Sequence, residues 1–261
     1  MTKKPNVSNP NSSRRIIEIH RAANIEVDQL FSSQPSFNLS DPCLDIEFKE
    51  YNQSTQVALP QPLSLPSRYD QLLAKRHTAR QYGPDKISLN ELSTLLYLSA
   101  GISTTKPICM SSGDWNFTRR SYPSAGARYP IEVYVISLRV HGVERGLYHY
   151  NVRSHSMELL DRSNFLDELR AITGENWIAN AQCAIALTAV FHRTINKYGD
   201  RGYRYILMEA GHLMQIVCTA SQALKINVCP VGGFVDDRLT SLLGVSISDE
   251  IPVYLAILGK P

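Results

Sequence analysis

Apolar and polar residues recur along the chain with two periods, and the longer period is helical. After Ser88, leucines at positions 92, 95 and 96 repeat at helical spacing. Ser88 and Glu91 form a capping-box pattern, in which each side chain satisfies a backbone amide of the other residue, and Gly101 is expected to end this helix at the C′ position. Residues 202–224 carry a longer helical pattern that is apolar on most of its circumference. This pattern predicts a central helix buried in the domain or in a dimer.

The shorter period predicts strands. Six stretches are rich in β-branched and aromatic residues, namely 131–138, 147–150, 156–160, 183–191, 226–229 and 253–258. The second and third of these are expected to pair through a turn at residues 152–155. With a short helix over 67–75 and the long helix, they predict an α+β domain with a central mixed β-sheet flanked by helices.

The regular spacing of apolar residues is lost toward the N-terminus. Residues 1–13 are polar and predict a disordered tail. Residues 14–66 are interpreted as an N-terminal arm, with a helix over 14–30 followed by a Pro- and Gln-rich stretch that should be extended and needs a surface to lie on. The ordered domain is expected to span residues 67–261.

Composition narrows the class of protein. The chain has 261 residues, of which 43% are hydrophobic and 20% charged, and this is typical of a globular protein. The net charge of +3 without basic clusters argues against nucleic acid as a partner. No apolar run approaches a membrane span, and no apolar segment follows the first charges as a secretory signal would require. Five widely spaced cysteines without a Cys-x-x-Cys motif predict a reduced, cytoplasmic protein, and the seven histidines show no pattern that binds metal.

Three segments could bind a phosphate-bearing or planar ligand. Arg76, His77, Thr78 and Arg80 follow a short helix, and guanidinium and hydroxyl groups are good phosphate donors. Residues 122–130 place small residues between two prolines, and residues 230–234 place Gly-Gly directly after a strand, so that backbone amides can approach a ring closely. Each segment alone is equally typical of an ordinary turn.

A fourth segment, residues 197–205, is dense in ionisable groups at the start of the long helix. Cations beside a tyrosine favour the phenolate, so Tyr198 with its neighbour Lys197 is a candidate general base. The alternative is a solvated polar helix start.

The order of these segments resembles the nitroreductase-like FMN flavoproteins, and within them the SagB/McbC-type azoline dehydrogenases. The residues that carry the resemblance are SYPSAGARYPIEVYV (121–135), GLYHYNVRSHSMELL (146–160) and NKYGDRGYRYILMEAGHLMQ (196–215), within a similarity that covers about residues 68–261. The resemblance implies a homodimer with the long helix at its interface and one FMN per subunit.

The resemblance also assigns roles to residues. Arg76, Thr78 and Arg80, with His77 beside them, would hold the FMN phosphate and ribityl chain, and Lys260 is a further phosphate candidate. The loop that would line the isoalloxazine, reaching in from the partner chain, consists of Pro123, Ser124, Ala125 and Gly126. The backbone amide of Gly232 would face the flavin N5, with Gly233 next to it.

Lys197 and Tyr198 stand where azoline dehydrogenases carry their catalytic Lys-Tyr pair. Aromatising a thiazoline or oxazoline removes one proton and one hydride, and the hypothesis is that Tyr198, assisted by Lys197, takes the proton while FMN takes the hydride. A cyclodehydratase complex would deliver the azoline-bearing precursor peptide. The alternatives are an NAD(P)H-dependent nitro or quinone reductase, an oxidase of another peptide or nonribosomal-peptide intermediate, and a flavin-free scaffold.

Overall fold

A computed structural model describes residues 48–64, 68–110 and 113–261. The predicted tail (1–13) and the predicted helix over 14–30 lie outside the described residues, as does the start of the helix expected over 67–75. That helix is described as α3 (Tyr69–Lys75).

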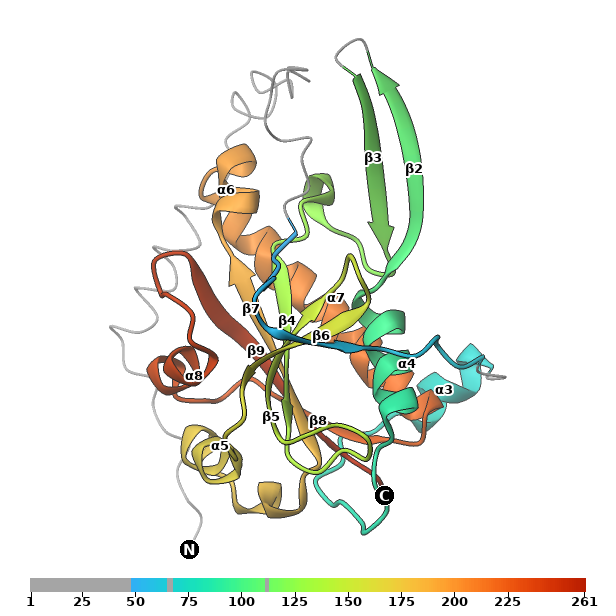
Figure 1. Ribbon diagram of the computed structural model, residues 1–261, viewed down its shortest axis with the longest axis vertical. Coiled ribbons are helices and arrows are strands. Elements are labelled where there is room, and N and C mark those ends of the chain that lie inside the picture. The colour runs from blue at the N-terminus through green and yellow to red at the C-terminus, as the bar shows by residue number, and fades with distance from the viewer. Residues whose placement is uncertain (1–47, 65–67, 111–112) are drawn as a thin grey trace, which may run out of the picture.

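A seven-stranded sheet forms the centre of the molecule, with the strand order β1-β6-β5-β4-β7-β9-β8 (Figure 1). All six predicted strands are present in it, with bounds that differ from the prediction by a few residues. The strands are β1 (Thr55–Ala58), β4 (Ile131–Ser137), β5 (Gly146–Asn151), β6 (Ser156–Asp161), β7 (Cys183–Val190), β8 (Asn227–Val231) and β9 (Glu250–Gly259). β1 belongs to the predicted arm, and its pairing with β6 provides the surface that the extended stretch required.

The α+β class is confirmed, whereas the pairing differs from the mixed sheet that was predicted. Every pairing of this sheet between described residues is antiparallel. The strands β7 and β8 run in the same direction and are joined through helices, which by itself suggests a parallel crossover. However, β9 lies between them and pairs antiparallel with both.

Helices cover both faces of the sheet. α4 (Leu89–Ala100) and α7 (Arg201–Ala223) pack on one face, and α5 (Leu166–Thr173) and α8 (Asp236–Leu243) pack on the other. The alternation of side chains along β4 shows the two faces, because Val133 and Val135 join the core under α4 and α7 while Tyr134 and Ile136 join the core under α5 and α8. The predicted long helix is thus α7.

The capping box of α4 is confirmed. The Ser88 side chain accepts from the Glu91 amide, and the Glu91 carboxylate accepts from the Ser88 amide. Gly101 ends the helix, but as the C-cap with φ −65° and not as a left-handed C′ residue. Glycine is needed there for space, since an added Cβ would lie 2.6 Å from the carbonyl oxygen of Tyr97.

A hairpin of β2 (Ile102–Met110) and β3 (Gly113–Arg120) was not predicted. It projects from the body of the protein as a separate two-stranded sheet (Figure 1). Pro107 and the irregular pattern before Gly113 argue against a strand there, whereas residues 114–118 do alternate between polar and apolar but form too short a run to predict a hairpin alone.

Candidate functional site

Lys197 and Tyr198 end the short helix α6 (His192–Tyr198), and the structure brings them to the predicted flavin loop of the same chain. Gly126 in that loop, within the 3-10 turn Ala125–Ala127, has φ +60°. A Cβ added to Gly126 would lie 2.7 Å from the Tyr198 hydroxyl oxygen and 3.3 Å from Lys197 Nζ. Glycine at this position therefore permits both the left-handed backbone and the close approach of the pair.

The two side chains of the pair also contact each other and the start of α7. Lys197 Nζ lies 5.5 Å from the centroid of the Tyr198 ring. The Tyr198 ring meets the Tyr205 ring edge to face, with 5.1 Å between centroids. An ammonium at this distance stabilises a negative charge on the phenol, which is the property that a general base needs.

A buried ion pair fixes α6, and with it the Lys-Tyr pair. Arg193, in the first turn of α6, binds the carboxylate of Glu132 on β4 and donates to the carbonyl oxygen of Tyr129 at 3.1 Å. Burial alone would raise the pKa of Glu132, but the hydrogen bond with His149 and the charge of Arg193 lower it to about 2. Glu132 is therefore ionised at physiological pH.

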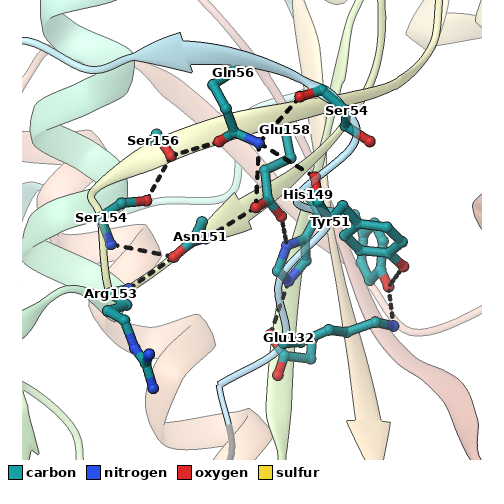
Figure 2. Close-up of polar contacts among 12 residues, drawn as sticks. Tyr51, Ser54, Gln56, Glu132, His149, Asn151, Arg153, Ser154, Ser156 and Glu158 are labelled. Atoms are coloured by element: carbon teal, nitrogen blue, oxygen red, sulfur yellow. Dashed lines mark hydrogen bonds and ion pairs between the residues drawn. The ribbon is translucent and has the colours of Figure 1, made fainter.

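His149 extends this ion pair across the sheet (Figure 2). On β5, its two ring nitrogens contact Glu132 of β4 at 2.9 Å and Glu158 of β6 at 2.8 Å. Burial opposes protonation, but the two carboxylates outweigh it and raise the pKa of His149. Gln56 on β1 reaches Glu158 at 3.4 Å, so the network also holds the edge strand.

Glu209 is a functional candidate that the sequence analysis missed. It lies on the buried side of α7 and is only 3% exposed, and its Oε1 atom has no hydrogen-bond partner among the described residues. Burial raises the pKa of Glu209 to about 7, although Ser124 in the loop and the charges of Arg120 and Arg193 act against the rise. A signal existed, because position 209 falls three residues after Ile206 on the apolar stripe of the predicted helix.

The residues predicted to bind the FMN phosphate form a second group, which lies near the C-terminal end of α7. Arg76, His77, Thr78 and Arg80 follow α3 with exposed side chains, and the amide of Ala79 donates to the carbonyl oxygen of Val228 at 3.0 Å, which aligns the segment beside β8. The guanidinium of Arg80 donates to the thiol of Cys229, and its carbon lies 5.9 Å from the ring of Trp177.

Gly232 and Gly233 follow β8 and are exposed. A Cβ added to either would meet no described atom within 4 Å, so the space beside both α-carbons is open. Exposed guanidinium and hydroxyl groups beside an unobstructed glycine backbone suit a ligand with a phosphate and a planar ring, and the residues present therefore fit FMN.

Lys260 is placed differently from the other phosphate candidates. Its amine binds the carboxylate of Glu91 and the carbonyl oxygen of Leu224, the latter at 3.1 Å. This ion pair ties the end of β9 to the start of α4, and it would have to open before Lys260 could contact a phosphate.

The two groups of residues lie at opposite ends of α7. Tyr198 contacts Tyr205 in the first turns of the helix, whereas the charge of Arg76 acts on Cys218 near its other end. At 1.5 Å per residue, these two contact points are roughly 20 Å apart along the axis. Within one chain, the Lys-Tyr pair and the predicted phosphate-binding segment do not converge.

The family of the chain follows from comparison with known proteins. The profile of the nitroreductase family matches residues 73–260, which include both groups. The chain belongs to the nitroreductase family. Membership of the nitroreductase family makes it an oxidoreductase by class, and the match begins shortly before Arg76 and ends at Lys260.

Two relatives carry names that point to different activities. A protein of Methanocaldococcus jannaschii that carries a nitroreductase name is 32% identical over 194 residues, which are 74% of this chain and 91% of that protein. The microcin B17-processing protein McbC of Escherichia coli is 27% identical over 155 residues, which are 57% of each chain. The similarity to SagB/McbC-type proteins is thus confirmed.

Solved structures confirm the nitroreductase-like fold. A nitroreductase from Anabaena variabilis has a TM-score of 0.71 and 26% identity, and the match covers 93% of this chain and 45% of that one. A chain of the E. coli microcin synthetase McbBCD complex with truncated pro-MccB17 bound has a TM-score of 0.59 and 20% identity, with coverage of 97% and 94%. This chain therefore spans just under half of the Anabaena protein and somewhat over half of McbC.

The described residues contain neither a cluster suited to a metal ion nor a helix suited to crossing a membrane. No group of three or more His, Cys, Asp or Glu side chains in them could hold a metal ion. None of the helices in the described ranges has both the length and the hydropathy for crossing a membrane.

Proposed function

We propose that this chain is an FMN-dependent dehydrogenase that oxidises thiazolines or oxazolines in a peptide to thiazoles or oxazoles. The observation that carries the proposal is the contact between the Lys197–Tyr198 pair and Gly126, which joins a candidate base to a loop expected to line the flavin. The similarity to McbC, whose name records microcin B17 processing, supports a peptide substrate.

The phosphate and ribityl chain of FMN would be held by Arg76, Thr78 and Arg80, and the ring would lie against the backbone of Gly232 and Gly233. When bound, FMN supplies an acceptor for the hydride that leaves the azoline ring. The absence of side chains at the two glycines would let a ring approach the backbone, whose amides could donate hydrogen bonds that favour negative charge on a reduced ring.

The Lys-Tyr pair would remove the proton from the azoline ring. The Tyr198 oxygen would take the proton from the α-carbon of the azoline, and the Lys197 ammonium would stabilise the phenolate on which this depends. Gly126 keeps the space beside the hydroxyl clear, since any larger residue would displace it. The ion pair of Arg193 with Glu132 holds the helix on which both side chains stand.

A homodimer would assemble the complete site. The outward side of α7 carries exposed apolar side chains at Tyr203, Leu207 and Met208, and Gly211 in the same stripe has open space around it. Two such helices packed about a two-fold axis perpendicular to them would run antiparallel, so the α6 end of one protomer would face the β8 end of its partner. One flavin at that junction would contact both groups of residues.

The peptide partner is proposed by analogy with McbC. A linear precursor peptide bearing azolines would be supplied by a cyclodehydratase in the reduced cytoplasm, because azolines form by dehydration of cysteine, serine or threonine side chains onto the backbone. The solved structure of the E. coli microcin synthetase McbBCD complex with truncated pro-MccB17 bound supports a complex with partner proteins and a precursor peptide.

The test uses the purified full-length chain reconstituted with FMN and a synthetic thiazoline peptide without oxygen. We expect the flavin absorption to bleach and the peptide to lose two hydrogens by mass. Tyr198→Phe should retain FMN and make no thiazole, whereas Arg80→Ala should lose FMN. Arg162→Ala, which removes an exposed guanidinium paired with Glu144, serves as the control for charge.

Thiazole formation at the wild-type rate by Tyr198→Phe would refute the assigned base. Full FMN occupancy in Arg80→Ala would remove that residue from the binding site. Each result bears on one half of the site, so the two assignments can fail separately.

A nitro or quinone reductase driven by NAD(P)H is the second candidate. It is favoured by the M. jannaschii relative, whose name is that of a nitroreductase and which is covered over 91% of its length. Rapid bleaching of the flavin by NADH or NADPH without oxygen would support the reductase, while a flavin that nicotinamide leaves oxidised and the thiazoline peptide bleaches would support the dehydrogenase.

A further inference from the structure

Tyr198 is the last residue of α6, a helix of seven residues, and the chain turns away directly after it. Gly199 has φ +53°, and its amide donates to the carbonyl oxygen of Ile195 at 2.8 Å. Such a turn fixes the main chain at the end of a short helix but leaves the rotation of the last side chain open. The orientation of the Tyr198 ring must therefore come from the side chains packed against it.

The first turn of α7 packs closely against α6 (Figure 1). A Cβ added to Gly202 would lie 3.1 Å from the Cα and 3.2 Å from the backbone nitrogen of Ile195, and the Gly202 amide donates to the carbonyl oxygen of Gly199 at 2.9 Å. Main chain therefore approaches main chain at this point. Because α7 is a helix of 23 residues packed on the core, its first turns give α6 a rigid neighbour.

Tyr205 is the side chain of α7 that meets the Tyr198 ring. The ring centroids lie 5.1 Å apart and the ring planes are at 88°, which is an edge-to-face arrangement that aromatic pairs prefer. At its other end, the Tyr198 hydroxyl oxygen lies 2.7 Å from the position that a Cβ on Gly126 would take. The loop thus bounds the hydroxyl, and Tyr205 bounds the ring that carries it.

A cation supports the Tyr205 ring in turn. The guanidinium carbon of Arg201 lies 5.7 Å from the centroid of that ring, within the range in which a cation is attracted to an aromatic face. Arg201 stands four residues before Tyr205 on α7, so the two side chains share one side of the helix. Two cation–tyrosine contacts, one from Lys197 and one from Arg201, therefore meet ring to ring.

We infer that Tyr205 is a positioning residue of the candidate site, whose ring, supported by Arg201, sets the orientation in which the Tyr198 hydroxyl faces Gly126. The ring contact is a property of the folded chain, and only its catalytic consequence rests on the proposed function. Because the role belongs to the ring and not to its hydroxyl, a phenylalanine should replace Tyr205 and an aliphatic side chain should not.

The variants separate the ring from the hydroxyl. Tyr205→Phe keeps the aromatic ring, and Tyr205→Leu removes it. Since Tyr205 is half-buried, both variants should fold, and urea unfolding checks this. Tyr97→Leu is the matched control, because Tyr97 is also half-buried on a helix and its ring meets that of His155 edge to face, with 5.4 Å between centroids.

The first readout is the proximity of Tyr198 to the loop, and it needs neither substrate nor flavin. The full-length protein is deuterated except at its tyrosine rings and glycine α-carbons, and the nuclear Overhauser effect between the Tyr198 ring and the Gly126 α-protons is assigned by its absence in Tyr198→Phe. We expect this effect in the wild type, in Tyr205→Phe and in Tyr97→Leu, and we expect its loss in Tyr205→Leu.

A further variant covers the case in which Tyr205→Leu does not fold. Arg201→Gln leaves both rings in place and should weaken the same nuclear Overhauser effect. An effect of wild-type strength in Tyr205→Leu, or in Arg201→Gln if the first variant does not fold, would overturn the inference. Its absence from the wild type, or its loss in Tyr205→Phe, would do so as well.

The second readout is catalysis by the reconstituted enzyme. Tyr205→Leu should lower kcat for the thiazoline peptide by about tenfold at an unchanged KM and FMN occupancy, because it misplaces the base and leaves binding intact. Tyr205→Phe should recover most of the wild-type kcat, and Tyr97→Leu should not change it. A wild-type kcat in Tyr205→Leu would refute the positioning role. If the wild type forms no thiazole, the proposed function fails, while the nuclear Overhauser effect still decides whether Tyr205 orients Tyr198.

Discussion

Replacing Glu209 by glutamine should make the protein more stable at alkaline pH. The change keeps the size of the side chain, and it removes only the ionisation of a carboxyl that is 3% exposed. The folded state favours the neutral form of Glu209, because burial raises its pKa from 4.5 to about 7.

The sign and magnitude of this change in the free energy of unfolding follow from proton linkage. Between pH 4.5 and about 7 the folded protein binds more protons at Glu209 than the unfolded chain does, so its stability falls as the pH rises through this window. Above the window, the cost of ionising the buried group is fully present. At 1.36 kcal/mol per pKa unit, that cost is roughly 3 kcal/mol.

The measurement is urea unfolding of both proteins at one fixed protein concentration, at several values between about pH 5 and 8.5. The free energy of unfolding of Glu209→Gln minus that of the wild type should rise by roughly 3 kcal/mol from the acid to the alkaline end. Glu144→Gln, at a side chain that is 69% exposed, should give a difference that does not change with pH.

A flat difference for Glu209→Gln would refute the reasoning. It would mean that the carboxyl has the same pKa in the folded and unfolded states, so that Arg120 or Arg193 compensates its burial. A difference that falls with pH would show that one of them pairs with it directly.

Two further substitutions test the geometry around the loop. If Tyr198 is the base that we propose, Gly126→Ala should lower thiazole formation by roughly a hundredfold, because the new Cβ would displace the Tyr198 hydroxyl. Gly174→Ala, where φ is +70° and a Cβ would meet no described atom within 4 Å, carries a similar backbone strain and should keep the activity. Glu132→Gln should destabilise the protein by about 3–5 kcal/mol in urea unfolding, because it leaves the buried guanidinium of Arg193 without its carboxylate. An unfolding free energy within 1 kcal/mol of the wild type would contradict the proposed anchoring of α6.

Local patterns predicted most of the fold correctly. The capping box at Ser88 and Glu91 and the stripe of α7 depend on neighbours in sequence, and both are in the structure. The antiparallel sheet could not be read in the same way, because the position of β9 between β7 and β8 is decided by contacts far apart in the chain. The hairpin of β2 and β3 was not predicted because β2 contains a proline and no regular alternation, and only a short stretch of β3 alternates.

The residues of the candidate site were likewise predicted where local sequence was informative and missed where it was not. Segments such as 76–80 and 230–234 were predicted from the chemistry of their residues, and the contact of Gly126 with Tyr198 gives a physical reason for the glycine that the sequence alone did not supply. Glu209 was missed because a glutamate in an apolar stripe becomes informative only when its burial in the folded protein is known.

The separation of the two half-sites along α7 has a consequence for genetics. In the proposed homodimer, each complete site takes its phosphate-binding half from one protomer and its Lys-Tyr half from the other. A chain that carries Tyr198→Phe and a chain that carries Arg80→Ala would each be inactive as pure dimers, yet after random reassortment about a quarter of all sites would contain two intact halves. Two null alleles would then complement each other, whereas a wild-type chain paired with either variant would still complete one active site and keep its share of the activity.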